Sequence, residues 1–469
     1  MQNESSYSLW SSRFIFILAA TGSAVGLGNI WKFPYITGVN GGGAFVLVYL
    51  LCIFAIGIPI LMAEILMGRR GRKDPINCLK YLAAESNKSP LWQALGWLGV
   101  IAGFLILSYY SVIAGWAMAY VPYMASGMFE GQAAAYINQQ FDSLISSPGT
   151  MILWHSIFMF MTMFVISKGV RQGLENAIKY LMPTLFILLL VLLVYAINHG
   201  DFSRGLSFLF SPDFSKISSD GVLSAMGHAF FTLSLGMGAI MVYGSYMPKN
   251  SSITNSAIWI ALFDTLVALI AGMVIFPIVF ANGLEPSAGP GLIFKTIPVA
   301  FGQMGAGSLF GTLFFVVLVF AAWTSAISLI EPAVVWVMDK FSITRVKASI
   351  ILGLMVWGLG LLSVFSFNIL SDFTFSQSIV MSTGEFVILK NATIFDTLDY
   401  LTSNIMLPLG GLLISFFVAW KMKKEYVHHE IKAHPFIFPI WQFLLKFVAP
   451  VAVIIVFLNA LGILSFLMK

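Results

Sequence analysis

The sequence has 469 residues, of which 59% are hydrophobic and only 10% are charged, whereas an average soluble domain has roughly 45–50% and about 25%. So few charges cannot cover a water-exposed surface, which excludes a soluble enzyme, a disordered protein and a secreted disulfide scaffold. The net charge of +5 does not indicate nucleic-acid binding, because the basic residues form short clusters between apolar runs. The two cysteines, Cys52 in an apolar run and Cys78 in a basic loop, do not support a disulfide framework.

Long apolar runs predict eleven membrane-spanning helices, because roughly 17 or more apolar residues suffice to cross a bilayer. The predicted spans are 13–37, 42–68, 90–124, 151–167, 177–198, 222–247, 253–281, 306–338, 345–369, 396–420 and 437–467. A membrane β-barrel is excluded, since it would need alternating strands of about ten residues. The predicted fold class is therefore an all-α polytopic membrane protein, placed in the cell (inner) membrane with the lipid bilayer as its surroundings.

Basic residues mark one side of the predicted membrane. They cluster in loops 69–89, 168–179 and 421–432 and in the turns after the sixth and eighth helices, whereas loop 125–150 has no Lys or Arg. The positive-inside rule then places the N-terminus in the cytoplasm. An odd number of helices places the C-terminus outside.

The first and sixth predicted helices contain glycine-rich stretches at mid-membrane depth, Ala20–Asn29 and Ser234–Gly238. A single glycine pair is equally well explained by close helix packing. Two breaks five helices apart favour an inverted repeat, because an odd number of spans reverses the direction of insertion. The predicted repeats are 13–198 and 222–420, and with the last helix, 437–467, they form a single domain covering 1–469. Unwound backbone inside a membrane is tolerated around a cavity, where it can bind ions or a carboxylate.

Several motifs resemble the signature of the neurotransmitter:sodium symporter family. The matching segments follow one another along nearly the whole chain: Gly22–Pro34, Asn40–Phe45, Pro59–Glu64, Tyr109–Tyr110, Phe230–Gly236 and Thr324–Ser325. Eleven helices, without a twelfth, resemble the bacterial amino-acid transporter branch. The resemblance implies the five-plus-five inverted repeat with broken helices 1 and 6, and transport rather than enzymatic catalysis.

The resemblance also implies two sodium sites built from oxygen ligands, which hard cations prefer. The first would use the Ala24 carbonyl and the side chains of Asn29, Thr232 and Asp264, completed by the substrate carboxylate. The second would use the carbonyls of Gly22, Val25 and Ala321 and the hydroxyls of Thr324 and Ser325. Taken alone, these two hydroxyls would be interpreted as bonded back to their own helix.

Asp264 stands out from the residues alone, because it lies in the otherwise apolar run Ile258–Ile270. A carboxylate at that depth is costly and is a functional candidate by default. His228 is a candidate partner, although a lone helical histidine is more often a hydrogen-bonded packing residue. Once sodium and substrate leave, burial disfavours the charged carboxylate. We therefore expect the empty carrier to return with a proton on Asp264, which amounts to proton counter-transport.

The resemblance also implies a substrate pocket between the two breaks. Its expected lining is Ser23, Gly26, Leu27, Gly28, Ile106, Tyr110, Phe231, Ser234, Met237, Ser325, Ala326 and Leu329. The Tyr110 hydroxyl and the N–H groups near Leu27 and Gly28 would hold a carboxylate. Amine-selective family members have an aspartate at the position of Gly26, so the glycine predicts a ligand that brings its own carboxylate. The flexible Met237 favours bulky apolar side chains.

Gate residues follow from the same resemblance. They are Lys32 and Asp399 at the outer gate, and Asp339 and Trp10 at the inner gate. The usual basic partner of the inner acid falls at Tyr7, so the inner ion pair is not expected. Gly173 and Pro183 match members in which helix 5 unwinds, although the same residues begin many ordinary helices.

These observations predict a sodium-coupled symporter that imports neutral, hydrophobic or aromatic α-amino acids by alternating access. We expect no chloride requirement, because Asp264 supplies a negative charge and Ala268, one turn later, has no hydroxyl to bind an anion. The alternative is a non-transporting amino-acid sensor on the same scaffold, which a soluble signalling domain would favour; the termini leave no room for one. A membrane enzyme would need a nucleophile–base–orienter set or a metal cluster, which His228 and Asp264 alone do not make.

Overall fold

The structure is a computed structural model that describes residues 9–286, 291–381, 384–431 and 435–460. Its first half contains the helical segments that make up the spans predicted from the apolar runs. They are α1 (Arg13–Ala24), η1 (Gly28–Lys32), α2 (Phe33–Val39), α3 (Gly43–Cys52), η2 (Ile53–Gly57), α4 (Ile58–Gly71), α6 (Gln93–Ala125), α8 (Pro148–Ser167), η4 (Val170–Glu175) and α9 (Asn176–His199). The segments labelled η1, η2 and η4 are wide, π-type turns that continue their helices.

The second half continues in the same way. The elements that make up its predicted spans are α11 (Ser219–Thr232), α12 (Ala239–Ser245), α13 (Ile253–Ala281), α15 (Gly307–Phe341), α16 (Arg345–Phe365), α17 (Ile394–Asp399), η6 (Tyr400–Met406), α18 (Leu407–Phe416), η7 (Phe417–Lys421), α20 (Ile437–Phe443), η8 (Leu444–Val448) and α21 (Ala449–Ala460). The expected end of the last helix at residue 467 lies outside the described residues.

Both predicted helix breaks are present. The axis bends by 52° between α1 and the η1–α2 helix, and residues 233–238 separate α11 from α12. In the described chain, nine helices are long and apolar enough to cross a membrane, and the bent α1–α2 pair makes ten. The α11–α12 pair would be one more span, so the total of eleven stays a prediction.

The connections contain structure that the apolar runs did not indicate. The helices in these connections are α5 (Pro75–Glu85), η3 (Pro90–Trp92), α7 (Ala134–Ser146), α10 (Phe202–Phe210), η5 (Leu292–Thr296), α14 (Ile297–Gln303) and α19 (Lys424–Ile431). Strands β1 (Phe375–Met381) and β2 (Gly384–Ala392) pair antiparallel and form a short hairpin in the otherwise helical fold that the sequence predicts. A search for long apolar runs misses this hairpin because strands of seven and nine residues are much shorter than a membrane-spanning helix.

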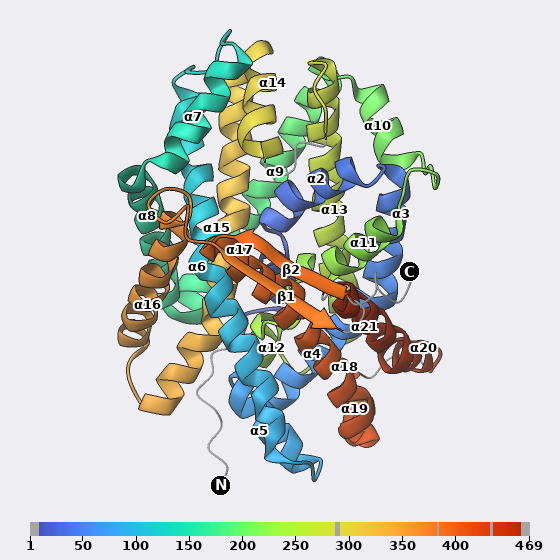
Figure 1. Ribbon diagram of the computed structural model, residues 1–469. Coiled ribbons are helices and arrows are strands. Elements are labelled where there is room, and N and C mark those ends of the chain that lie inside the picture. Colours follow the sequence, from blue (N-terminus) through green and yellow to red (C-terminus); the bar gives the residue numbers. More distant parts are fainter. Residues whose placement is uncertain (1–8, 287–290, 382–383, 432–434, 461–469) are drawn as a thin grey trace.

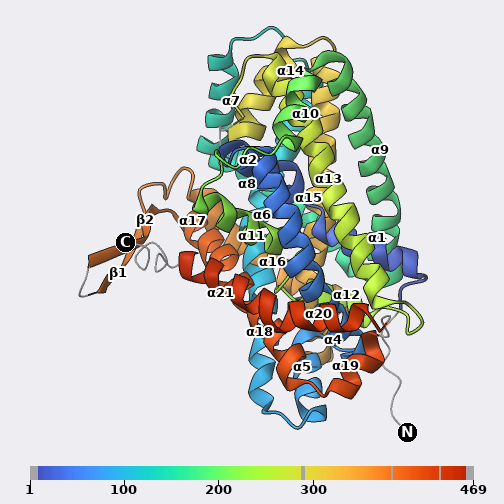
Figure 2. The same ribbon diagram turned by 90° about the vertical axis from the view of Figure 1, so that its right-hand side faces the viewer.

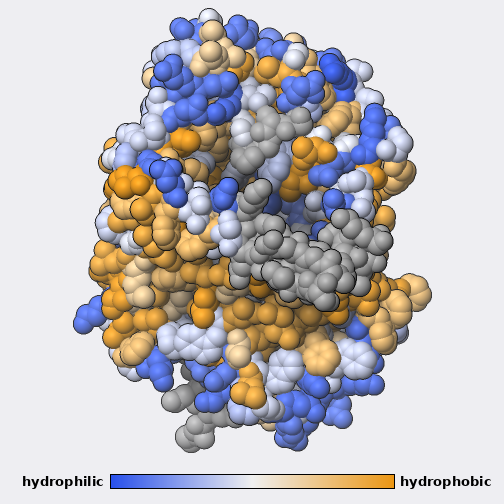
Figure 3. Space-filling view, in the orientation of Figure 1, coloured by the Kyte–Doolittle hydropathy of each residue, from blue (hydrophilic) through white to orange (hydrophobic). Residues whose placement is uncertain are grey.

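The long helices run roughly side by side, as Figure 1 and Figure 2 show. Helices α7, α10 and α14 lie at one end of the bundle, which we call the α14 end. Helices α5 and α19 lie at the other, the α5 end. Figure 3 shows apolar residues across the middle of one face and hydrophilic residues towards both ends, the distribution expected of a protein that crosses a bilayer.

Helices α4 and α12 approach each other closely through glycines. A Cβ atom added to Gly68 would overlap the carbonyl oxygen of Met241, and one added to Gly244 would lie 2.9 Å from the carbonyl oxygen of Ile65. Small residues that let helix backbones approach are a common way to pack helices in a membrane. The segment of helix 6 after its break is therefore held firmly against α4.

We predict that Gly68→Ala lowers the thermal unfolding temperature of the purified protein in detergent, because the added methyl costs about 1–3 kcal/mol of packing strain. Gly358→Ala on α16 is the matched control, since no heavy atom lies within 4 Å of its added Cβ. The control should unfold at the wild-type temperature or slightly above, because alanine has the higher helix propensity. Equal unfolding temperatures for Gly68→Ala and the wild type would contradict this packing.

Candidate functional site

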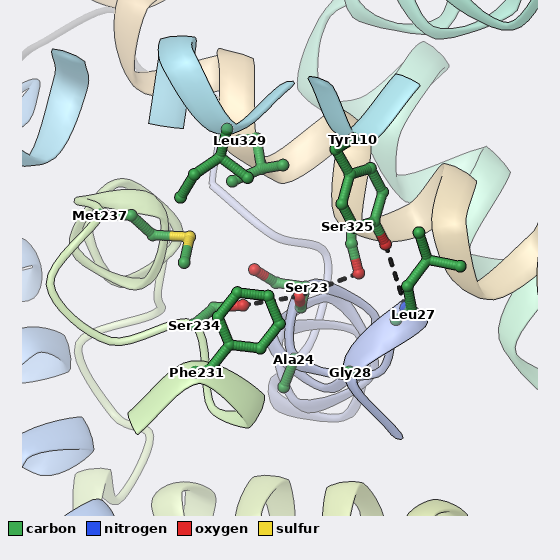
Figure 4. A pocket seen from close by; sticks show the side chains of 12 residues that line it. Ser23, Ala24, Leu27, Gly28, Tyr110, Phe231, Ser234, Met237, Ser325 and Leu329 are labelled. Carbon is green, nitrogen blue, oxygen red and sulfur yellow. Dashed lines mark hydrogen bonds between the residues drawn. The ribbon is translucent and has the colours of Figure 1, made fainter. Parts of the chain in front are cut away.

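A cavity lies between the two helix breaks (Figure 4). The structure brings nearly all the predicted pocket residues to its wall: Ser23, Gly26, Leu27, Gly28, Ile106, Tyr110, Phe231, Ser234, Met237, Ser325 and Leu329. Ala24 lines it as well, whereas the predicted Ala326 is buried on α15 and is not among the lining residues. Residues from α1, α6, α11 and α15 therefore meet around one cavity.

The unwound backbone of helix 6 is held by two hydrogen bonds. Ser234, Gly236 and Gly238 have φ angles of 54°, 83° and 75°, so the chain enters the left-handed region that favours glycine. The Ser234 hydroxyl donates to the carbonyl of Ser23 at 2.8 Å, and the Gly236 N–H donates to Oε1 of Glu64 at 2.6 Å. Glu64 is fully buried on α4. Sequence reasoning gave it no role, although a carboxylate within an apolar helix is the signal that singled out Asp264.

Tyr110 and Ser325 enclose the break in helix 1. The N–H of Leu27 donates to the Tyr110 hydroxyl oxygen at 3.2 Å, which leaves the hydroxyl proton available for a ligand. A Cβ atom on Gly26 would lie 2.5 Å from Oγ of Ser325 and 2.8 Å from the Tyr110 hydroxyl. The cavity therefore has no room for a side chain at position 26.

The side chains of Asn29, Thr232 and Asp264 meet beside this cavity. The Asn29 amide donates to Oδ1 of Asp264 at 2.7 Å and to Oγ1 of Thr232 at 3.1 Å. The Thr232 hydroxyl donates to Oδ2 of Asp264 at 3.0 Å. Asp264 is fully buried, and these partners are neutral. No side-chain cation is among these contacts, and hydrogen bonds hold both oxygens of the carboxyl group.

A second group of oxygens joins α1 to α15. The Ser325 hydroxyl donates to the carbonyl of Val25 at 2.9 Å and faces that of Gly22 at 3.4 Å. The Thr324 hydroxyl bonds back to its own helix, donating to the carbonyl of Ala321 at 3.1 Å. The back-bonded interpretation therefore holds for Thr324, whereas Ser325 reaches across to the end of α1. A Cβ on Gly22 would lie 3.4 Å from Cβ of Thr324, so all five residues are neighbours.

His228 is not a direct partner of Asp264 in the described structure. Its ring stacks on Phe33 with centroids 5.9 Å apart and packs on Tyr49 at 5.4 Å. It is 2% exposed, and among the described residues neither ring nitrogen has a hydrogen-bond partner. The packing interpretation of this histidine is the one that the structure favours.

A larger cavity adjoins the central one and shares Leu27, Gly28, Tyr110 and Phe231 with it. The predicted outer-gate residues Lys32 and Asp399 both line this larger cavity. The Lys32 ammonium lies 4.3 Å from the centroid of the Phe231 ring, a cation–π contact. Asp399 accepts hydrogen bonds from Tyr109 at 3.1 Å and Ser403 at 2.9 Å. Within the described part of the chain, Lys32 and Asp399 form no ion pair with each other.

Towards the α5 end, the predicted inner-gate residue Trp10 is only 2% exposed. Its indole N–H donates to the carbonyl of Tyr243 at 3.1 Å, and its backbone N–H to that of Tyr246 at 3.0 Å. The Tyr246 hydroxyl donates to Oε1 of Glu331 at 2.8 Å, and Arg345 forms an ion pair with the same carboxylate.

Sequence reasoning placed the inner-gate acid at Asp339, which is exposed near the end of α15, and did not identify the Glu331–Arg345 pair. Glu331 is fully buried in an apolar helix, so the signal that identified Asp264 applied to it too. The predicted Tyr7 lies outside the described residues.

Gly173 and Pro183 lie in a continuous span, Val170–His199, so helix 5 is wound where the resemblance suggested unwinding.

Comparisons with known proteins agree with this geometry. The family model described as "Sodium:neurotransmitter symporter family" matches residues 8–128 and 128–466. An uncharacterized sodium-dependent transporter of Bacillus subtilis, YhdH, is 39% identical over 97% of this chain and 98% of its own length. A sodium-dependent transporter of Haemophilus influenzae is 32% identical over 96% of this chain and 98% of its own. The crystal structure of MhsT in complex with L-phenylalanine is 42% identical, with a TM-score of 0.86, over 97% of this chain and 100% of MhsT.

The chain belongs to the sodium:neurotransmitter symporter family. Like its relatives in this family, it is a sodium-dependent, multi-pass membrane transporter and not an enzyme. The family also accounts for the two helix breaks, since transporters bind their cargo where discontinuous helices line a cavity near the middle of the membrane.

We predict that Gly26→Ala lowers sodium-driven transport about tenfold or more, because the methyl group would displace the Ser325 and Tyr110 oxygens at a packing cost of roughly 1–3 kcal/mol. Uptake into proteoliposomes, normalised to inserted protein, measures the effect. Gly358→Ala, whose added Cβ meets no neighbour, should transport at the wild-type rate. Wild-type transport by Gly26→Ala would show that the wall of this cavity is not part of the pathway.

Proposed function

We propose that the protein imports neutral, hydrophobic or aromatic α-amino acids together with sodium by alternating access. The observation that carries this proposal is the juxtaposition at the break in helix 1. There the N–H of Leu27 and the Tyr110 hydroxyl meet within one cavity, next to the hydrogen-bonded Asp264. L-phenylalanine in the similar protein MhsT supports an amino acid as the ligand.

The cavity suits a ligand that carries a carboxylate and an apolar side chain. The carboxylate would accept hydrogen bonds from the Tyr110 hydroxyl and from the N–H groups at Leu27 and Gly28. Gly26 leaves no room for the aspartate that would pair with a simple amine. The apolar side chain would lie against Ile106, Met237 and Leu329. Methionine adapts to different shapes, which supports a preference that includes aromatic side chains.

Two sodium ions would travel with the amino acid. The first would bind the Ala24 carbonyl, the side chains of Asn29, Thr232 and Asp264, and the substrate carboxylate. Because the Asn29 carbonyl oxygen accepts from the Gly26 N–H and its amide nitrogen faces Asp264, the amide would have to rotate to present oxygen to the ion. The second ion would bind the carbonyls of Gly22, Val25 and Ala321 and the hydroxyls of Thr324 and Ser325. Each set consists of oxygen, as sodium requires.

The cavities support an orientation and a place in the transport cycle. Lys32 and Asp399 line the larger cavity, whereas Trp10 and the Glu331–Arg345 pair close the α5 end. The α5 end also contains the basic loop 69–89, so it would face the cytoplasm, with the N-terminus inside and the C-terminus outside. The structure would then represent a state closed to the cytoplasm. Alternation would come from two inverted repeats, 13–198 and 222–420, with 437–467 outside them.

Uptake of radiolabelled amino acids into proteoliposomes tests the proposal. With an inward sodium gradient, we expect leucine, phenylalanine and tryptophan to be taken up in preference to glycine and glutamate, and no uptake without sodium. Replacement of chloride by gluconate should leave the rate unchanged, because Asp264 supplies the negative charge. Sodium-dependent binding without uptake would instead support the amino-acid sensor, and a large loss of rate in gluconate would refute chloride independence.

We predict that Asp264→Asn abolishes uptake and weakens sodium affinity at least about tenfold, because hydrogen bonds and ion contacts to a charged group contribute roughly 1.5–3 kcal/mol. Sodium titration of substrate binding in detergent measures the affinity. Asp213→Asn, which removes a surface carboxylate paired with Lys216, is the control and should bind and transport like the wild type. Unchanged sodium affinity in Asp264→Asn would refute the first sodium site.

A measurement of interior pH during uptake tests the proposed return of the empty carrier with a proton on Asp264, with Asp264→Asn as the control. If the carrier releases a proton outside in each cycle, sodium-driven uptake should make the vesicle interior more alkaline, as reported by an enclosed pH-sensitive dye. Acidic interior pH should also speed turnover. Wild-type uptake with no substrate-dependent alkalinisation, after correction for proton leak, would show that the return step carries no proton.

A further inference from the structure

An arginine near the end of α4 connects three segments at the α5 end of the protein. The side chain of Arg69 is only 5% exposed. Its Nη1 donates to the carbonyl of Ser251 at 2.6 Å, in the connection between α12 and α13. Its Nε donates to Oε2 of Glu430 on α19 at 2.8 Å, and its Nη2 to the backbone carbonyl of the same residue. All three guanidinium nitrogens therefore hold acceptors on other segments.

The position of Ser251 makes this contact relevant to transport. The residue joins α12, the segment after the break in helix 6, to α13, which carries Asp264. Other donors hold the last carbonyls of α12: Arg72 binds that of Ser245 at 2.7 Å, and Trp10 binds that of Tyr246. Basic side chains donate hydrogen bonds to the free carbonyls at the C-terminal end of a helix and interact favourably with the negative end of its dipole. The inner ends of helices 6 and 7 are thus fixed by donors from other segments, with Arg69 at the turn between them.

Glu430 is the acid that sets the position of Arg69. It is 14% exposed and lies on α19, a short helix whose residues Val427 and Ile431 are buried. Its other carboxylate oxygen lies 3.5 Å from Arg70, whose guanidinium also stacks 3.9 Å from the Tyr426 ring. Arg70 has a second acid, Glu85, in a two-point pair at 2.7 and 2.6 Å. In the described structure, Arg69 has Glu430 as its acidic partner.

We propose that Glu430 is a positioning residue for the transport cycle, which keeps Arg69 on the Ser251 carbonyl and so holds the inner ends of helices 6 and 7 in the closed arrangement. A guanidinium that is buried without its carboxylate is strongly destabilised, so loss of Glu430 would draw Arg69 towards water. The turn at Ser251 would then lose its donor. Opening towards the α5 end would require the same contacts to separate, which makes α19 part of the moving machinery.

A cysteine in place of Ser245 would report this opening. Ser245 is 1% exposed at the end of α12, so a reagent in water would reach the cysteine only when the α5 end opens. The test uses full-length Ser245→Cys protein in which Cys52 and Cys78 are replaced by alanine, and it measures the rate of labelling by a water-soluble maleimide in detergent. We expect Glu430→Gln to raise the labelling rate without sodium about tenfold, a typical coupling between linked sites. Glu85→Gln removes a carboxylate from Arg70 and leaves the Arg69–Glu430 contact in place, so it is the matched control and should stay near the parent rate.

Two further variants separate positioning from general damage. Glu430→Asp keeps the charge and should label close to the parent rate. Arg69→Lys keeps the charge but cannot bind three acceptors as a planar fork, so it should label as fast as Glu430→Gln. Saturating sodium should slow labelling in every correctly folded variant, which a misfolded protein would not show. Labelling at the parent rate in both Glu430→Gln and Arg69→Lys would overturn the proposal, as would equal acceleration by Glu85→Gln.

Discussion

The hydrogen bonds that satisfy the broken backbone of helix 6 are the condition for everything else in the structure. Unpaired N–H and C=O groups inside a membrane cost several kcal/mol each, so a helix can be interrupted there only where other groups replace the missing bonds. Ser234 binds a carbonyl of helix 1, and Glu64 binds the Gly236 N–H. One break thus stabilises the other, and the cavity between them is a consequence of this mutual support.

Three carboxyl groups that are fully buried within the long helices have three different kinds of hydrogen-bond partner. Glu331 has a cation, Arg345. Glu64 has a backbone N–H of unwound chain. Asp264 has neutral amide and hydroxyl donors, and no cation is among these hydrogen-bond partners. A buried carboxylate without a cation beside it attracts an incoming positive ion, because the attraction between charges is strong in a low-dielectric interior.

Long apolar runs and mid-membrane glycines predicted the spans and the two breaks, because both are strong local signals, whereas the grouping of the pocket residues was inferred from the family resemblance. Asp264 was identified from a local signal too, as a charge without a neighbour. Contacts between distant segments were not predictable in this way. Glu331 and Arg345 are fourteen positions apart but pair only because α15 and α16 turn back on each other, and the Ser251 carbonyl that Arg69 binds carries no signal in its side chain. The Lys32–Asp399 pair was inferred from resemblance, whereas cation–π attraction and local hydrogen bonds hold the two side chains elsewhere.

The wide turn η6 begins directly after Asp399. A π-type turn accommodates one more residue than an α-helical turn, and its geometry is less stable than that of the α-helix on either side. Conversion of η6 to α-helical geometry would rotate the preceding α17 by about 100°, the step of one residue around a helix. Asp399 would then be turned about the helix axis without any hinge or loop movement. A carboxylate mounted on such a turn can change which residues it faces by a change in helical register alone.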